Sequence, residues 1–240
     1  MTGAFLNALG ILLGAFFGLA RREPLTLRTQ KSCQSALGAF TAFCGLQLVW
    51  LNVGGAFSVV VKQLFIAVLA IVLGSLLGKI LGLQKISNRL GRHAAQLLTR
   101  AEKNPAARPA DGFLAATILF CAAPMGIIGA LTDGLGYYFY PLAIKGVMDG
   151  LAMTSFVKSH RWPVALAALP VFFFLSGLTW LAQHNLANAL SNPALMHSFN
   201  AAAGLILCAI TLLILQVRRV EIANFLPALA LAPLLTHWLG

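Results

Sequence analysis

Two residues of opposite charge, Lys145 and Asp149, interrupt an otherwise apolar stretch at about residues 138–157. They are four positions apart, so in a helix they share one face and can form an ion pair. A lone charge at the centre of a membrane costs roughly 2.5–3.5 kcal/mol by insertion scales, so this face is expected to point into the protein or a wet cavity. There Asp149 would bind a cation or a proton, and Lys145 would compete for its carboxylate. The alternative is a pair that only locks helix packing.

A second candidate feature is Pro124, within the preceding apolar stretch at about residues 112–131. Proline removes one backbone hydrogen bond and clashes with the turn before it, so the helix is expected to kink or break there. Gly126 weakens the following turn, and a new half-helix is expected to begin near Met125 with its positive end directed inward. Such an end suits an anion, and the carbonyl end of the other half suits a cation. An ordinary kink without a ligand is the alternative.

Three further polar residues are candidates for the same site. Asp133 follows the proline-containing stretch and is interpreted as a solvated turn residue or a helix cap, with an acidic path towards Asp149 as the alternative. Asn7 and Asn224 lie on the first and last apolar stretches, where hydrogen bonding between helices is the preferred interpretation. Both remain candidate ligands of a bound solute.

The hydropathy pattern indicates the elements that must hold these residues. A helix needs about 20 apolar residues to cross ~30 Å of hydrocarbon. Hydrophobic residues make up 59% of the chain and charged residues 10%, far fewer charges than soluble domains carry. We therefore predict an all-α, polytopic membrane protein in a single domain over residues 1–240, with about eight transmembrane helices. They lie at about residues 3–20, 33–51, 63–83, 112–131, 138–157, 163–182, 198–216 and 222–238.

Basic residues indicate the orientation of the chain. Lysine and arginine gather in every second gap between the apolar stretches, where positive charge resists translocation, so these gaps are predicted to be cytoplasmic and both termini periplasmic or extracellular. The net charge of +11 is divided among these loops. This distribution favours a bilayer with anionic headgroups as the partner and argues against nucleic acid.

The longest gap contains an additional predicted element. Over about residues 84–101, apolar positions such as Ile86 and Leu90 recur at helical spacing among basic residues. This pattern is typical of an amphipathic helix on the membrane interface.

A faint internal similarity concerns residues 3–51 and 63–131. The phrases ILLGAFFGLA and IVLGSLLGKI align two pairs of glycines, as expected if these helix hairpins are repeats. Glycine at every fourth position also lets helices pack closely, which explains the match without a repeat.

Catalytic and metal-binding motifs are missing from the sequence. The five histidines fall in loops or near the ends of the apolar stretches, and no HExxH, GxSxG or GxGD signature occurs. We therefore expect no enzyme, no catalytic residue, no cofactor and no bound metal.

The phrase FCAAPMGIIGALTDGL, followed by IKGVMDG, resembles the signature of the bacterial YqgA/YdfK-like membrane proteins, the domain of unknown function 554. The opening GAFLN and the closing NFLPAL match the two ends of that family, so the resemblance covers almost the whole chain. One departure is Ala123, where the family is expected to carry glycine before Pro-Met. The resemblance implies a multi-pass protein of the bacterial inner membrane and implies no particular activity.

Together these features predict a small-solute or ion transporter or channel. The alternative is a scaffold or partner subunit without transport, for which glycine-rich helices and polar packing residues suffice. A homo-oligomer formed through a GxxxG face fits either hypothesis. A membrane-embedded enzyme is the least favoured, because no nucleophile and base are paired. The candidate solute or ion ligands are Lys145, Asp149, Asp133, Pro124, Met125, Gly126, Asn7 and Asn224.

Overall fold

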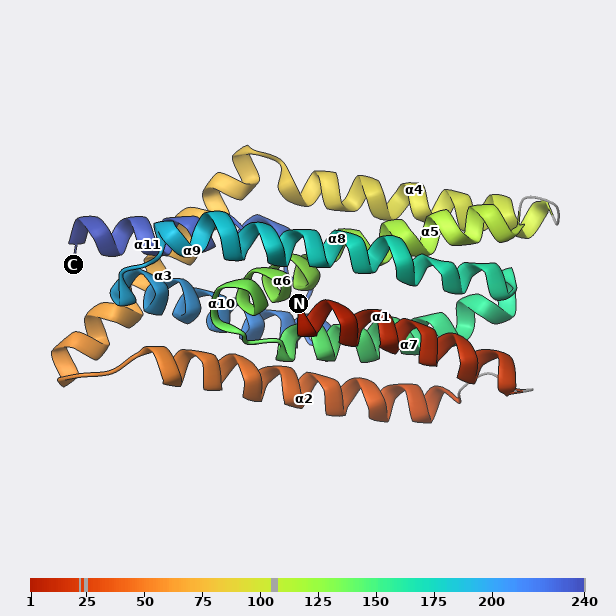
Figure 1. Cartoon of the computed structure of the whole chain (residues 1–240), viewed down its shortest axis with the longest axis horizontal. Helices are drawn as coiled ribbons and strands as arrows, with labels where there is room; N and C mark the ends of the chain where they lie inside the picture. Colours follow the sequence, from red (N-terminus) through yellow and green to blue (C-terminus); the bar gives the residue numbers. More distant parts are fainter. Residues whose placement is uncertain (22, 24–25, 105–107, 240) are drawn as a thin grey trace. The chain divides into compact units, whose positions relative to one another are not determined.

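The computed structural model describes residues 1–21, 23, 26–104 and 108–239. Almost all of these residues are helical, which confirms the predicted all-α class (Figure 1). The chain divides into two compact units, and the single domain over residues 1–240 stays a prediction. Unit 1 comprises Met1–Gln34 and Ile86–Trp180, and unit 2 comprises Ser35–Lys85 and Leu181–Gly240.

Unit 1 is built around two helices that lie side by side, α1 and α7 (Figure 1). The α5 and α6 helices, the 3-10 turn η1 and the α8 helix pack around them. Their bounds are α1 Thr2–Ala20, α5 Arg108–Ala122, α6 Pro124–Gly136, α7 Tyr140–His160, η1 Trp162–Ala167 and α8 Ala168–Leu181.

Glycines bring the α1 and α7 backbones into direct contact. A Cβ atom built on Gly14 would lie 2.0 Å from the carbonyl oxygen of Gly150, and one on Gly10 would lie 2.3 Å from that of Gly146. No other residue type fits at such distances, because every other side chain begins with Cβ. The contact moves from Gly10 and Gly146 to Gly14 and Gly150, towards higher residue numbers in both helices, so α1 and α7 run parallel. This direction agrees with the predicted topology, in which they are the first and fifth spans.

Apolar side chains surround this contact and form the core of unit 1. They come from α1, α5, α6, α7, η1 and α8, and burying them removes the apolar surface that gives the unit its cohesion. The largest fully or almost fully buried members are Ile11, Phe120, Leu142, Met153 and Leu175.

The predicted break at Pro124 is confirmed. The α5 and α6 helices are bent by 56° relative to each other, and α6 begins at Pro124, the first helical position, where a missing N–H costs nothing. Ala123, between them, has φ −67° and ψ 120°, an extended conformation that alanine adopts without strain. The departure from glycine at this position is therefore compatible with the break.

Unit 2 also relies on close glycine contacts, but between antiparallel helices. A Cβ atom on Gly78 would lie 2.2 Å from the carbonyl oxygen of Asn224, and one on Gly74 would lie 2.5 Å from the backbone nitrogen of Ala228. From Gly74 to Gly78 the contact moves back from Ala228 to Asn224, so α3 and the helix over Ile222–Leu239 run in opposite directions. The unit contains most of α2 (Leu27–Asn52), α3 (Phe57–Ile80), η2 (Ala182–Leu186), α9 (Ala187–Ala189), α10 (Pro193–Ile214), η3 (Ile222–Phe225) and α11 (Ala228–Leu239).

Seven of the eight predicted spans agree with helices of the described chain that are long and apolar enough to cross a membrane. Six are single spans: α1, α2, α3, α10, the helix over Trp162–Ala189 and the helix over Ile222–Leu239. The bent pair α5 and α6 is the seventh when its two helices are taken together as one broken span. The remaining predicted span corresponds to α7, which is outside this set because Lys145 and Asp149 lower its mean hydropathy.

The predicted amphipathic helix is present as α4, Leu83–Lys103. Its C-terminal end is tied to α5 by an ion pair between Arg100 and Asp111, 3.4 Å apart, and by a hydrogen bond from Arg108 to the carbonyl of Ala101. Figure 1 shows α4 extending lengthwise along α5. A surface helix would instead lie across the spans. Its placement on the membrane interface therefore stays a prediction.

Candidate functional site

The α7 helix carries Lys145 and Asp149 into the interior of unit 1. Lys145 is 2% exposed and Asp149 is 8% exposed. The Lys145 ammonium donates a hydrogen bond to Asp149 Oδ2, as the spacing of one helical turn permits. Asp149 lies next to the midpoint of Tyr140–His160, so the pair is close to the centre of this helix.

The α1 helix adds a third polar group, Asn7, which is fully buried. Its Nδ2 donates a hydrogen bond to Asp149 Oδ2 at 3.1 Å. The short amide reaches the carboxylate because Gly146 lets the two backbones approach; a Cβ at that position would lie 2.8 Å from Asn7 Cα. Asn7 Oδ1 is buried and has no hydrogen-bond partner in the described part of the chain. The cluster therefore contains an acceptor that is free to bind a donor or a cation.

The break between α5 and α6 lies against the Lys145 side chain. A Cβ built on Gly126, in the first turn of α6, would lie 2.9 Å from Lys145 Cε and 3.2 Å from Leu175 Cδ2. The Lys145 ammonium lies 5.8 Å from the centre of the Phe120 ring, in the last turn of α5. An aromatic face and the negative end of a helix both favour a cation. The Lys145 aliphatic chain thus fills the space beside the break.

The site, defined as Asn7, Gly126, Lys145 and Asp149, is formally neutral because one ammonium balances one carboxylate. A proton or small cation that binds Asp149 would have to displace or share the ammonium of Lys145. The free Asn7 oxygen is the nearest further acceptor that the cluster offers. A cation that displaces the Lys145 ammonium would add one positive charge to the site, and the buried ammonium would then need another partner.

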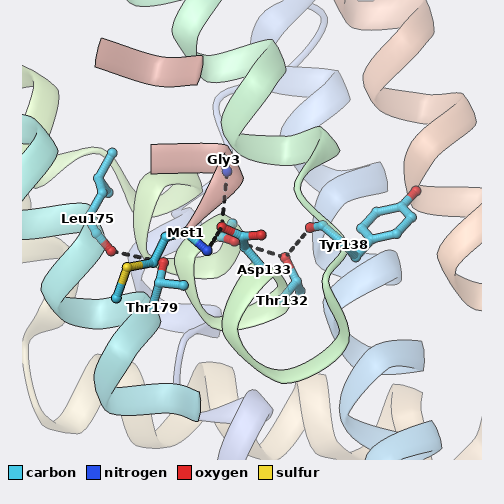
Figure 2. Close-up of polar contacts among 8 residues, drawn as sticks. Met1, Gly3, Thr132, Asp133, Tyr138, Leu175 and Thr179 are labelled. Atoms are coloured by element: carbon cyan, nitrogen blue, oxygen red, sulfur yellow. Dashed lines mark hydrogen bonds and ion pairs between the residues drawn. The ribbon is translucent and has the colours of Figure 1, made fainter. Parts of the chain in front are cut away.

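Asp133 differs from the expectation of a solvated turn residue, because it is only 2% exposed. It accepts a hydrogen bond from Gly3 N at 3.0 Å and lies 3.3 Å from the amino group of Met1 (Figure 2). The first turn of α1 has free N–H groups and a positive end, which bind this carboxylate. Asp133 is thus a cap, but one for α1 and not for its own helix.

Figure 2 also shows how the loop after Asp133 is held. Thr132 donates to the carbonyl of Tyr138 at 3.2 Å and to that of Gly129 at 3.1 Å. Within α8, Thr179 donates to the carbonyl of Leu175 at 2.9 Å (Figure 2). These bonds satisfy buried hydroxyls, and the bond from Thr132 to Tyr138 holds the loop against the end of α6.

The remaining predicted residues divide between the two units. Pro124 begins α6 and Met125 follows it, 6% exposed. Asn224 belongs to unit 2, where its Oδ1 accepts from Gln84 N at 3.1 Å and its Nδ2 donates to Glu221 at 2.7 Å. Both of these bonds stay within unit 2, and the role of Asn224 stays a prediction.

Sequence reasoning missed the contributions of Phe120, Gly146 and Gly150. The two glycines are four positions apart, the same spacing as Gly14 and Gly18, so the small-residue rule could have identified them. No comparable signal marks Phe120, because one aromatic residue in an apolar span is ordinary. Among the described residues, no group of three or more His, Cys, Asp or Glu side chains is placed to hold a metal ion.

Comparisons with known proteins agree over nearly the full length. The chain is 32% identical over 240 residues to the uncharacterized protein YqgA of Escherichia coli (strain K12), covering 99% of this chain and 97% of that protein. It is 23% identical over 234 residues to the uncharacterized membrane protein YdfK of Bacillus subtilis (strain 168), covering 97% and 94%. No solved structure matches. Residues 2–237 match the family described as protein of unknown function DUF554, and the chain therefore belongs to that family.

Proposed function

We propose that this membrane protein is a small-solute or ion transporter or channel of the bacterial inner membrane, with Asn7, Lys145 and Asp149 as its binding site. The single observation that carries the proposal is the buried ion pair of α7, which meets an unpartnered amide oxygen beside a helix break. A buried ion pair contributes little net stability, and apolar residues of similar volume often pack as well or better. Ionisable residues inside a membrane are accordingly associated with ion and solute pathways.

The proposed binding step takes place at Asp149. A proton or small cation binds the carboxylate, and the Lys145 ammonium moves off it. The Phe120 ring and the carbonyl end of α5 favour the displaced ammonium, because both carry partial negative charge. Asn7 continues to donate to the carboxylate and so keeps it in place. The proposal includes no catalytic step.

The experiment is a flux measurement in proteoliposomes that contain a pH-sensitive dye or a dye for sodium or potassium. We expect the Asp149→Asn variant to lose at least tenfold of the flux, since the neutral amide cannot bind a proton or a cation as the carboxylate does. The matched control is Asp111→Asn, which also neutralises a buried acid of unit 1 but lies outside the site. Flux that survives Asp149→Asn undiminished would contradict the proposed role.

A scaffold or partner subunit is the second candidate, and one observation favours it. The space beside the break is filled by the Lys145 chain, which would contact any Cβ at Gly126. A packed centre is expected of a protein that only holds others. Purification from native membranes at low detergent would yield a stoichiometric partner, or a second copy of this chain, if this candidate is correct. A wild-type protein without flux for protons, sodium or potassium would also support it.

We further propose that both termini lie on the periplasmic or extracellular side. The support is the concentration of basic residues in alternate gaps between spans. Fusion of alkaline phosphatase, which is active only outside, to the C-terminus should give active enzyme. Fusion to the gap that contains Arg89 and Arg100 should give inactive enzyme, and the reverse pattern would overturn the proposed orientation.

A further inference from the structure

A groove runs along the contact between α1 and α7, on the side where their large apolar residues are exposed. It encloses a cavity of about 300 Å³. Its floor consists of glycines, including Gly14 and Gly150, and Leu13, Phe17 and Val147 form its rim. These three rim residues are between 48% and 56% exposed, so the groove is open to the bilayer. In a membrane, such an opening borders the acyl chains of the lipids.

One end of this groove is charged. Arg21, Lys158 and Glu23 line it, which gives two positive groups and one negative group. The Lys158 Nζ atom is buried and has no hydrogen-bond partner among the residues that the structure describes. A buried ammonium without an acceptor is costly, so this position calls for an anionic oxygen.

The length of the groove fits one leaflet of a bilayer. From Gly10 to Arg21 the helix rises about 16 Å, at 1.5 Å per residue. Half of the hydrocarbon core measures about 15 Å. The two basic residues follow the first and fifth predicted spans, at the level of the headgroups. Apolar walls of leaflet depth, with cations at the surface end, match the two parts of a phospholipid.

We propose that the groove binds a phospholipid, whose phosphate is held by Lys158 and Arg21 and whose acyl chain lies on the glycine floor. This assignment is independent of the proposed transport, because none of the groups that bind the lipid belongs to the site around Asp149. The phosphate supplies the acceptor that the Lys158 ammonium lacks. The Glu23 carboxylate at the same end opposes an anion, but Arg21 and Lys158 together leave this end with a net charge of +1.

Native mass spectrometry of the full chain in detergent tests the assignment. Dioleoylphosphatidylglycerol is titrated against the wild-type protein and the Lys158→Met variant. The loss of one charged hydrogen bond is expected to raise the dissociation constant about tenfold. Dioleoylglycerol, which has no phosphate, should bind both proteins equally weakly. The matched control is Arg218→Gln, which removes an exposed basic residue of unit 2 and should leave the affinity within twofold of wild type.

Arg21→Gln provides a second variant that does not endanger folding, because Arg21 is exposed. It should weaken phosphatidylglycerol binding about threefold, less than Lys158→Met, since an exposed charge contributes less. Wild-type affinity in both variants would overturn the proposal. A mass spectrum that shows a dimer of the wild-type chain without bound lipid would also overturn it. If the variants lost as much affinity for dioleoylglycerol as for phosphatidylglycerol, the proposal would also be overturned, because the phosphate would then contribute nothing to binding.

Discussion

Unit 1 and unit 2 are both assembled on glycine contacts, yet they bury different kinds of polar group. In unit 1 the parallel pair α1 and α7 encloses a lysine, an aspartate and an asparagine. In unit 2 the polar cluster of α10 contains two amides and a histidine: Asn52 Oδ1 accepts from Asn200 Nδ2 at 3.0 Å and lies 3.0 Å from His197 Nδ1. Close helix packing therefore does not by itself require charges.

The difference directs the search for a solute or ion site to unit 1, which holds the buried charges. A buried amide pair stabilises a helix contact at modest cost, because its hydrogen bonds are satisfied and no charge leaves water. A buried ion pair carries a larger desolvation cost that its own attraction barely offsets. The predictions below test this contrast in order of decreasing effect.

The glycine contact of unit 1 should be the most sensitive position. Replacing Gly14 with leucine places a side chain where even Cβ would be 2.0 Å from a backbone oxygen, and neither helix can move without opening the core. We expect the Gly14→Leu protein to be absent from the monodisperse peak in size-exclusion chromatography. Gly177→Leu, at a position with open space, is the control and should elute normally. Normal elution of both variants would mean that α1 and α7 are not in contact.

Loss of the ion pair between Lys145 and Asp149 should have the second-largest effect on stability. Asp149→Leu leaves the Lys145 ammonium buried without its partner, which costs about 3–5 kcal/mol. For a chain of this length that corresponds to a drop in Tm of roughly 10 °C, measured by the decay of the folded peak on heating. The double variant Lys145→Met/Asp149→Leu removes both charges and should recover most of the loss. A double variant as unstable as the single one would show that the charges do not interact.

The glycine contact of unit 2 should tolerate substitution better than the glycine contact of unit 1. Gly78→Ala places a methyl group 2.2 Å from the carbonyl oxygen of Asn224, near the end of the helix pair, where a small displacement is easier than at the centre. A loss of about 1–3 kcal/mol is expected. Gly91→Ala, at an open helical position in α4, is the control and should raise Tm by about 2–4 °C, because alanine favours a helix by about 1 kcal/mol.

The amide pair of unit 2 should show the smallest effect. Asn200→Ala removes one hydrogen bond to Asn52, and such bonds between membrane helices are worth about 0.6 kcal/mol on average. The expected loss in Tm is about 2 °C. A loss as large as that of Asp149→Leu would remove the distinction between the charged and uncharged centres.

The sequence was sufficient to predict what depends on neighbouring residues. Apolar length predicted about eight spans, of which six agree with single helices long and apolar enough to cross a membrane and one with the bent pair, because a helix must satisfy its backbone inside a membrane by itself. Pro124 predicted the break because its ring excludes the preceding helical turn. The spacing of Lys145 and Asp149 predicted their pairing, since one turn of helix separates them.

Other features required the tertiary structure, because they join positions far apart in the chain. The bond from Asn7 to Asp149 spans 142 residues, and that from Gly3 to Asp133 spans 130. The sequence offered Asn7 and Asn224 alike as candidates and Asp133 as a possible cap, but no local pattern indicates that Asn7 reaches Asp149 or that Asp133 caps α1. Both hydrogen bonds depend on which glycine-containing helix faces contact each other, and the packing of whole helices determines that contact.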